Sequence, residues 1–257
     1  MNSKEIESII GNLIDTFISS GNVSLKLRSE GLEKKIKTDN TPVTNGDIEV
    51  NNIVTKKISN LTPNIKIVSE ETMLNKENNE MKDFWLIDPI DGTYDYIHGK
   101  DEFTINAALI LNKKPAAGII YAPAKKRLFY SFGPSNSFEI ENGLKKKLEC
   151  QKKSKTNEVN AVTYSTNLKQ EIADIYKKYK ITNFTRMKSS LKFCVIASGE
   201  FDFYAAEPRA CEWDIAAGHA ILKDAGGIIT DFDGNEITYG KKDFKNTSLI
   251  LRRSEDL

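Results

Sequence analysis

An apolar run that ends in acid constrains this chain more than any other feature of its sequence. Residues 84–99 read FWLIDPIDGTYDYIHG, so a strand-like segment ends at Asp88, and Asp91 follows three residues later. An ionised carboxylate that leaves water must be paired or must hold a cation. Two carboxylates beside a hydrophobic strand therefore predict a positive ion at this point.

The residues between the two acids predict how the acids come together. Along an uninterrupted strand, Asp88 and Asp91 would point to opposite faces. Pro89 cannot continue a central ladder, so we expect the strand to end at Asp88 and residues 89–92 to turn, which brings Asp91 back toward Asp88. The turn would also expose the carbonyl of Ile90. Two carboxylates and a carbonyl form the hard oxygen site that suits Mg²⁺.

The next residues predict a place for an anion. Gly92 lets a phosphate approach the backbone, and Thr93 can cap a short helix that begins at Tyr94. The amide groups and the positive dipole end of that helix would face the anion. A bare Asp-Gly-Thr is more often an ordinary capped turn, but DPIDGT after an apolar strand is more specific. We therefore predict that metal and phosphate share one site.

Two acidic segments elsewhere could complete the cation site. A second apolar run, residues 65–68, ends in SEE, and its Glu70 reaches the same cation if the two strands are neighbours. Asp214 takes an N-cap-like position before a predicted helix that begins with small residues. Taken alone, a Glu-Glu pair such as Glu70-Glu71 is usually surface charge, and Asp214 is equally explained as an ordinary helix cap. Four carboxylates within roughly 4 Å repel by about 1 kcal/mol per pair in water and by about 4 kcal/mol at an effective dielectric constant of about 20, so such a cluster needs divalent cations.

Hydrophobic periodicity predicts the surrounding elements. Apolar residues recur at three- and four-residue steps over residues 6–18, which predicts a helix that stops at Gly21. A second helix is predicted to follow Thr44 and to end at Pro63. Residues 103–142 read as consecutive antiparallel strands separated by polar turns. Beyond them, helical and strand segments alternate, which is typical of a layered α/β lobe.

Length and charge predict two closely packed lobes with a balanced surface. The 257 residues are enough for a large core, and a boundary is expected near residues 145–158. An N-terminal α+β lobe would span residues 1–150, and a C-terminal α/β lobe would span residues 151–257. With 37 basic and 36 acidic residues the net charge is +1, so no global field recruits a nucleic acid polymer or an anionic membrane. Any anionic ligand must be captured locally.

Cysteine usage and hydropathy predict a soluble, cytoplasmic protein. Cys150, Cys194 and Cys211 are far apart and odd in number, which fits buried thiols in a reducing compartment better than disulfides. No uncharged run approaches about 18 residues, so neither a signal peptide nor a membrane span is expected. The two histidines form no Cys/His cluster, which disfavours zinc, and His219 is expected to be packed or hydrogen-bonded.

Taken together, DPIDGT and WDIAAG, preceded in the chain by TPVTNGD and SEE, resemble the motifs of the inositol monophosphatase superfamily of magnesium-dependent, lithium-sensitive phosphatases. The resemblance covers nearly the whole chain. It implies a layered α-β-α-β-α sandwich that hydrolyses a small phosphate monoester by in-line attack of water, with two or three Mg²⁺ ions. By that match the metal ligands are Glu70, Asp88, the carbonyl of Ile90, Asp91 and Asp214, and the phosphate is held by Gly92 and Thr93.

The resemblance also implies catalytic residues. Asp47, in TPVTNGD, matches the family position that works with Thr93 to orient and deprotonate the attacking water, and Glu70 is counted with them. The competing interpretation is structural, because Thr44 and Asp47 also have the spacing of a capping box.

Further strings resemble the CysQ-like branch of that family, the 3'(2'),5'-bisphosphate nucleotidases, which remove a phosphate from adenosine 3',5'-bisphosphate. The strings are SSLKFCVIASGEFDFY, TPVTNGDIEVN and CEWDIAAG. Lys192 would suit a second phosphate, and Asp214 would also contact substrate. That branch commonly continues Asp-x-Tyr with Pro-Arg, whereas here Tyr204 is followed by Ala-Ala-Glu-Pro-Arg. Glu207 lies seven residues before Asp214, the spacing at which inositol monophosphatases place a glutamate that binds sugar hydroxyls.

Three functions therefore stay open at this point. The leading hypothesis is a bisphosphate nucleotidase, and the nearest alternative is an inositol monophosphatase or a related sugar-phosphate phosphatase. The third is a catalytically silent module that binds metal or phosphate for regulation, against which the complete set of ligands argues. The expected partner is a small phosphorylated metabolite and not a nucleic acid polymer. Phosphatases of this kind occur as monomers and as homodimers.

Overall fold

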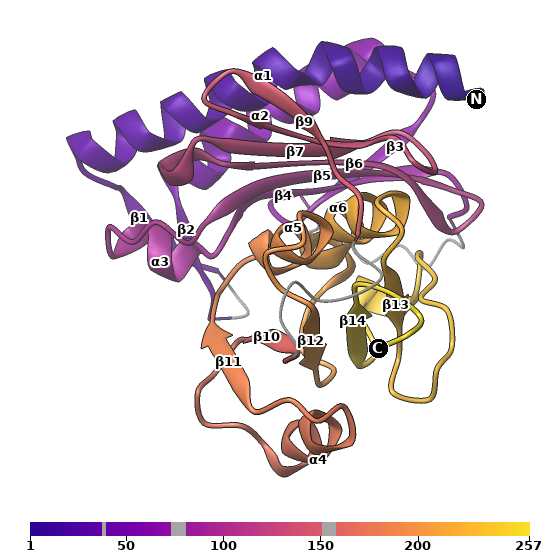
Figure 1. Ribbon diagram of the computed structural model, residues 1–257. Helices are drawn as coiled ribbons and strands as arrows, with labels where there is room; N and C mark the ends of the chain where they lie inside the picture. The colour runs from indigo at the N-terminus through magenta and orange to yellow at the C-terminus, as the bar shows by residue number, and fades with distance from the viewer. Residues whose placement is uncertain (38–39, 73–80, 151–157) are drawn as a thin grey trace.

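Two sheets separate three layers of helices in the computed structural model of this chain (Figure 1). Two helices cover the outer face of a seven-stranded sheet, two more lie between that sheet and a five-stranded sheet, and one covers the outer face of the second sheet. The predicted α-β-α-β-α sandwich is confirmed. The structure describes residues 1–37, 40–72, 81–150 and 158–257.

The seven-stranded sheet follows the order of the sequence. Its first two strands are parallel, and every later pair is antiparallel. The prediction of consecutive antiparallel strands over residues 103–142 is therefore confirmed. The strands are β3 (Lys66–Ser69), β4 (Phe84–Asp91), β5 (Thr104–Leu111), β6 (Lys114–Ala122), β7 (Arg127–Ser131), β8 (Ser137–Glu141) and β9 (Leu144–Lys147).

The first two helices, α1 (Ser3–Glu30) and α2 (Asn45–Leu61), cover one face of this sheet. Their apolar stripes are buried against the strands, and each fully buried Ile or Phe side chain contributes about 1.5–3 kcal/mol. The predicted stop at Gly21 is wrong, because α1 continues to Glu30. A Cβ at Gly21 would lie 2.3 Å from Cε1 of Tyr121, so this glycine serves a close helix–sheet approach and not a helix end. The second helix begins and ends as predicted.

The five-stranded sheet is built from the second half of the chain, in the order β11-β10-β12-β14-β13. Helices α5 (Leu191–Ala197) and α6 (Glu212–Asp224) lie between the two sheets, and α4 (Gln170–Lys178) packs on the outer face. The strands are β10 (Asn160–Thr163), β11 (Asn183–Arg186), β12 (Phe203–Ala206), β13 (Ile228–Thr230) and β14 (Leu249–Arg252). A hairpin of β1 (Lys34–Ile36) and β2 (Pro42–Thr44) and the short helix α3 (Thr93–Ile97) complete the elements near the site.

The two sheets share one core through the inner helices. The apolar cluster between them includes Phe84 and Ile120 from the first sheet, Ile215 from α6, and Tyr204 and Leu251 from the second sheet. The division into lobes 1–150 and 151–257 stays a prediction, and the expected boundary overlaps residues 151–157, which lie outside the described residues.

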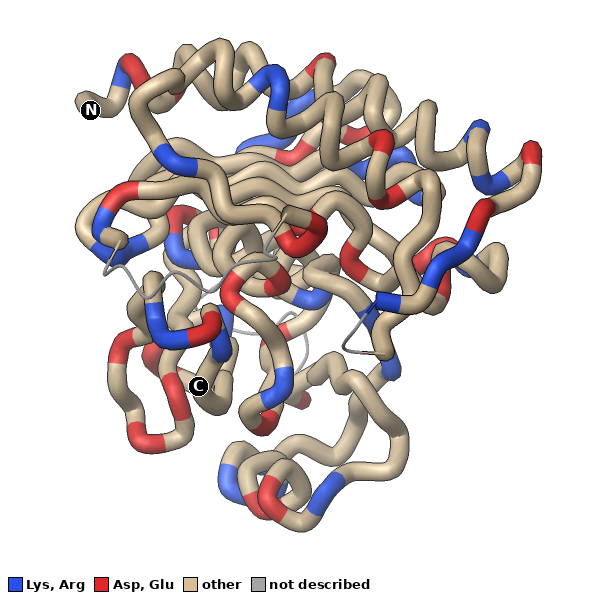
Figure 2. Tube along the Cα trace, turned by 180° about the vertical axis from the view of Figure 1, so that it is seen from behind, with Lys and Arg blue, Asp and Glu red and all other residues tan. Residues whose placement is uncertain are grey.

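Charges of both signs alternate over the molecule. Figure 2 shows Lys and Arg interspersed with Asp and Glu along the chain, in keeping with the net charge of +1. No helix in the described part of the chain is both long and apolar enough to cross a membrane. All three cysteines are free thiols; Cys194 is buried as expected, whereas Cys150 and Cys211 are only half-buried.

Candidate metal and phosphate site

A β-bulge in β4 sets the positions of its two acids. Asp88 pairs with Asn106 of β5 and Asp91 pairs with Thr104, so three steps along β4 oppose two steps along β5. The extra residue re-aims the second acid, and carboxylate oxygens of the two lie within 4.8 Å of each other. The predicted turn is wrong in form, because the strand continues through Pro89 to Asp91. Proline is tolerated there because a bulge interrupts the ladder hydrogen bonds.

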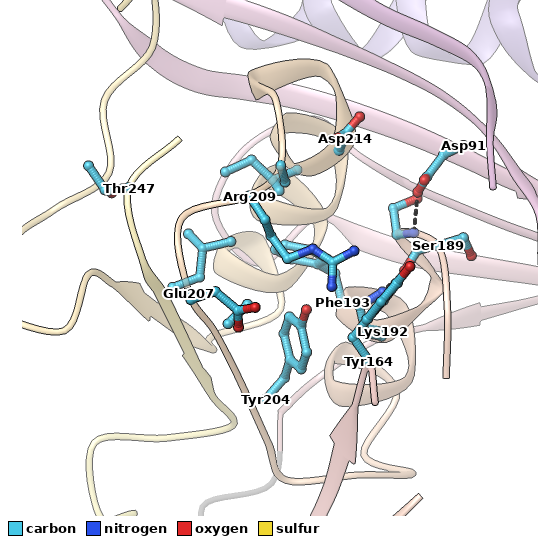
Figure 3. A pocket seen from close by; sticks show the side chains of 15 residues that line it. Asp91, Tyr164, Ser189, Lys192, Phe193, Tyr204, Glu207, Arg209, Asp214 and Thr247 are labelled. Carbon is cyan, nitrogen blue, oxygen red and sulfur yellow. Dashed lines mark hydrogen bonds between the residues drawn. The ribbon is translucent and has the colours of Figure 1, made fainter. Parts of the chain in front are cut away.

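The first turn of α6 places Asp214 against the strand acids. One carboxylate oxygen from each of Asp88, Asp91 and Asp214 lies within 4.8 Å of the other two. Asp214 is the third residue of α6 and Cys211 is the N-cap, so the N-cap-like position expected for Asp214 is wrong. The amide of Cys211 donates to Oδ2 of Asp214 at 2.7 Å, which holds the side chain in place. Figure 3 shows Asp91 and Asp214 on the same side of the cavity described below.

These three acids carry an electrostatic cost that a cation would remove. Asp88 is 1% exposed, and among the described residues its Oδ1 accepts no hydrogen bond. Burial and then the neighbouring carboxylates raise the pKa of Asp88, and they raise that of Asp214 to about 8. Burial also raises the pKa of Asp91, although Lys192 and the amide of Ser190 oppose the shift. The cluster therefore fits a divalent cation, which attracts all three groups at once.

Glu70 lies beside this cluster and is paired with a lysine. Its amide donates to the carbonyl of Ile87 at 3.1 Å, next to Asp88. The charge of Glu70 adds to the raised pKa of Asp88, after burial, yet Glu70 is not one of the three acids whose oxygens meet within 4.8 Å. Its Oε1 accepts from Nζ of Lys37 at 2.9 Å, and Lys37 also pairs with Glu71 at 2.7 Å. Of the four predicted acids, the structure brings three together and places the fourth alongside.

Asp47 and Thr93 meet at the side of the cluster. Oδ2 of Asp47 accepts from the amide of Thr44 at 2.8 Å and from its hydroxyl at 2.5 Å, which forms the capping box of α2. The hydroxyl of Thr93 lies 3.3 Å from Oδ1 of Asp47 and 3.1 Å from the carbonyl of Ile90, its two alternative acceptors. One carboxylate thus has both the capping geometry and the contact with Thr93 that the catalytic hypothesis needs. Its pKa is raised by burial.

Gly92 is the N-cap of α3, and Thr93 is the first residue of that helix and not its cap, which corrects the sequence prediction. Gly92 has φ +96°, the left-handed region that favours glycine. A Cβ there would also lie 2.9 Å from the carbonyl oxygen of Glu102. The role of Gly92 and Thr93 in binding phosphate stays a prediction.

A cavity of about 130 Å³ opens beside Asp91 and Asp214 (Figure 3). Its lining includes Lys192, which is only 7% exposed and donates to the carbonyl of Ser189. Burial lowers the pKa of Lys192 to about 8, although the charge of Asp91 opposes the shift. The other cation of the lining is Arg209, and its aromatic residues are Tyr164, Phe193 and Tyr204. Basic and acidic side chains therefore line one cavity.

Glu207 also lines this cavity, but its carboxylate is not free. Its Oε1 is paired with Nζ of Lys169 at 2.8 Å. The sequence spacing suggested an acceptor for sugar hydroxyls, and this ion pair occupies part of its accepting capacity. His219 is buried and hydrogen-bonded to the hydroxyl of Tyr239 at 2.9 Å, as predicted.

Sequence reasoning missed three residues of the site. Lys37 lies in a lysine-rich stretch with no distinguishing pattern, and Tyr164 belongs to no motif. The one sequence signal for Arg209 is the string Ala-Ala-Glu-Pro-Arg after Tyr204, which departs from the family pattern.

The fold and the site together define a class of protein, a five-layered sandwich that gathers carboxylates from a bulged strand and a helix N-terminus beside a cavity lined by both acidic and basic side chains. The model of the inositol monophosphatase family matches residues 6–255. The chain belongs to the inositol monophosphatase family.

Individual relatives show which branch of the family this chain resembles. The chain is 34% identical over 224 residues to the 3'(2'),5'-bisphosphate nucleotidase CysQ of Buchnera aphidicola subsp. Acyrthosiphon pisum, covering 86% of this chain and 83% of the relative. The solved structure of CysQ from Bacteroides thetaiotaomicron matches with a TM-score of 0.76 and 27% identity over 96% of this chain and 97% of that one. An IMPase of Thermotoga maritima matches with a TM-score of 0.74 and 26% identity over 93% and 90%. The resemblance to the CysQ-like branch is confirmed.

Proposed function

We propose that this protein is a magnesium-dependent 3'(2'),5'-bisphosphate nucleotidase that hydrolyses adenosine 3',5'-bisphosphate to AMP and phosphate. The observation that carries the proposal is one cavity whose lining includes two acids, Asp91 and Asp214, and two cations, Lys192 and Arg209. The acids suit the metal that assists hydrolysis of one phosphate, and the cations suit a second phosphate. Similarity to CysQ nucleotidases over most of the chain supports the same substrate.

The acidic residues would hold the metal. Asp88, Asp91, Asp214 and the carbonyl of Ile90 would bind Mg²⁺, which when present supplies positive charge to the phosphate and lowers the pKa of water. Glu70 would join them through Oε2, because Lys37 engages only Oε1. The unpartnered Oδ1 of Asp88 and the raised pKa of Asp214, caused first by burial, support this assignment.

Asp47 and Thr93 would handle the proton of the attacking water. The Thr93 hydroxyl donates to Oδ1 of Asp47, which leaves the hydroxyl oxygen free to accept a hydrogen bond from water. As water attacks phosphorus, its proton would pass to the Thr93 oxygen while the Thr93 proton passes to Asp47. Burial raises the pKa of Asp47, which suits it to accept that proton. Gly92 would keep the backbone open for the phosphate.

A second candidate is hydrolysis of inositol 1-phosphate or a related sugar phosphate. The observation in its favour is Glu207, which lines the cavity at the position where a hydroxyl acceptor is expected. Its ion pair with Lys169 weakens that role. A catalytically silent module is disfavoured because the metal-binding acids and the pair of Asp47 and Thr93 are all in place.

We also propose a cytoplasmic location and sensitivity to lithium. The three free thiols support a reducing compartment. A small monovalent cation would compete for the same carboxylates, so lithium should inhibit at concentrations at which sodium does not.

A phosphate-release panel tests the function. Purified protein is assayed on adenosine 3',5'-bisphosphate, inositol 1-phosphate and fructose 1,6-bisphosphate, with Mg²⁺, with chelator, and with lithium or matched sodium. We expect the highest kcat/KM on the adenosine bisphosphate, loss of activity in chelator, and recovery with Mg²⁺. Preference for inositol 1-phosphate would transfer the assignment to the second candidate. Activity that persists after exhaustive chelation would refute the metal mechanism.

A further inference from the structure

Arg209 is an exposed cation of the cavity lining. It lines the cavity beside the acids and also a neighbouring cavity of about 40 Å³. Over residues 1–37, 40–72, 81–150 and 158–257 it forms no ion pair within 4.0 Å, although Glu207 lies only two positions away in the chain. The carboxylate of Glu207 is engaged by Lys169 instead. The guanidinium is therefore available to an anion from solution.

Arg209 adds a like charge to the one already in the cavity. Burial lowers the pKa of Lys192, and the positive charge of Arg209 contributes to lowering it further, so the two cations lie within electrostatic range of each other. The charges of Asp91, Asp214 and Glu102 oppose this shift, but Asp91 and Asp214 belong to the acidic cluster, whose charge a bound metal would neutralise. With a metal bound there, two neighbouring cations are unfavourable unless an anion lies between them. Arg209 and Lys192 thus favour an anion in this cavity.

Tyr164 holds the guanidinium in a defined plane. The guanidinium carbon of Arg209 lies over the Tyr164 ring, 3.3 Å from its centroid, so the guanidinium packs against the face of the ring. Stacking uses the face of a guanidinium and leaves the N–H donors at its edge free. That planar edge matches two oxygens of a phosphate. In Figure 3 the Arg209 side chain extends into the cavity, and the hydroxyl of Tyr204 points toward it.

We infer that Arg209, stacked on Tyr164, is a specificity-determining residue that binds the phosphate the enzyme does not hydrolyse, together with Lys192. The inference rests on the proposed function, because it takes the substrate to carry two phosphates. Tyr164 is a positioning residue, since it acts by orienting Arg209. A substrate with a single phosphate binds that phosphate at the acidic cluster. It has no second phosphate for Arg209 and Lys192 to bind, so neither residue should lower its KM.

Two substrates that differ only in the second phosphate test this inference. Adenosine 3',5'-bisphosphate and adenosine 3'-monophosphate share the scissile group, so only the first can use Arg209. In Arg209→Gln we expect KM for the bisphosphate to rise roughly tenfold or more, the effect of losing a charge-assisted hydrogen bond. We expect kcat to stay within about twofold, and both constants for the monophosphate to be unchanged. Arg186→Gln is the matched control, because it removes one positive charge from exposed strand β11, outside both cavities.

Variants of Tyr164 separate positioning from direct contact. Tyr164→Phe keeps the ring and should leave both KM values unchanged, whereas Tyr164→Leu should raise KM for the bisphosphate severalfold and not that for the monophosphate. Tyr164 is 38% exposed, so neither change should lower the melting temperature by much. Product inhibition gives an independent measurement: AMP keeps the 5'-phosphate and adenosine lacks it, so Arg209→Gln should weaken inhibition by AMP alone.

The outcomes distinguish this inference from the function on which it rests. Wild-type protein that does not hydrolyse the bisphosphate overturns both. Wild-type protein that hydrolyses it, with Arg209→Gln leaving KM for the bisphosphate unchanged, overturns the inference alone. An equal rise in KM for both substrates also overturns it, because Arg209 would then act on a part of the ligand that the two substrates share.

Discussion

The acidic and the basic walls of the cavity hold like charges together in two different settings. Asp91 and Asp214, the acidic wall, are held by the bulged strand β4 and by the first turn of the buried helix α6. On the basic wall, Lys192 is buried on helix α5, whereas Arg209 and Tyr164 are exposed in the segments that follow β12 and β10. We expect the acids on regular elements to fix where a metal binds, whereas Arg209 and Tyr164, on connecting segments, can change with little effect on the core. Substitutions at Arg209 and Tyr164 should therefore alter substrate choice and leave the chemistry intact.

The largest expected effect comes from breaking the acidic wall with Asp91→Asn. The two side chains have nearly the same shape, so packing is kept while a metal-binding charge is lost. We expect phosphate release to fall by at least about a hundredfold. In chelator at pH 8 the melting temperature should be unchanged or higher, because burial already favours the neutral form of Asp91. Undiminished turnover would refute the role of Asp91, and a large loss of melting temperature would show that the residue is structural.

Metal binding should depend on pH because protons and Mg²⁺ compete for the acidic wall. Burial and the neighbouring acids raise the pKa of Asp214 from 3.8 to about 8, so the metal-free protein loses stability as pH rises from about 4 to 8. Mg²⁺ must displace that proton below pH 8. We expect the Kd for Mg²⁺, measured by calorimetry, to fall by up to about tenfold per pH unit between pH 6 and 8 and then to level off. Equal affinity at pH 5.5 and pH 8 would contradict the prediction.

The basic wall should respond to pH in the opposite direction. Burial lowers the pKa of Lys192 to about 8, so its positive charge is present below pH 8 and is lost above it. In the wild type, KM for adenosine 3',5'-bisphosphate should rise above pH 8 by up to about tenfold per pH unit. Lys192→Arg keeps the charge and should remove this slope, whatever its absolute KM. A slope that persists in the arginine variant would exclude Lys192 as its source, and adenosine 3'-monophosphate serves as the control substrate.

The smallest expected effect is at the edge of the basic wall. Lys169 is 70% exposed where it pairs with Glu207, so Lys169→Gln should change the free energy of unfolding by less than about 1 kcal/mol. The unpaired Glu207 would then repel a bisphosphate weakly, and we expect its KM to rise by about two- to threefold in steady-state assays. Improved turnover of inositol 1-phosphate in the same variant would show that the ion pair suppresses a hydroxyl-binding role of Glu207. A rise of tenfold or more would mean that Lys169 binds substrate directly.

Sequence reasoning succeeded where the causes are local. Three predicted features depend on neighbours a few positions apart, and the structure has all three. They are the apolar strand before Asp88, the Thr44–Asp47 capping pattern, and the strands separated by polar turns over residues 103–142. It failed in detail where packing overrides a local preference. Gly21 does not end α1, because its missing side chain admits Tyr121, and Pro89 does not end β4, because a bulge accommodates it.

The sequence is enough to predict which groups would carry the chemistry: the acids, the Gly92-Thr93 step that follows them, and the helix that begins near Asp214. Which of these groups meet, and which side chains face them, depends on how the layers pack. The amide of Ser190 donates to Asp91 across 99 positions of the chain, and Arg209 stacks on Tyr164 from a different segment. Such contacts leave no periodic trace, because their energy depends on the packing of layers and not on the spacing of residues along one element.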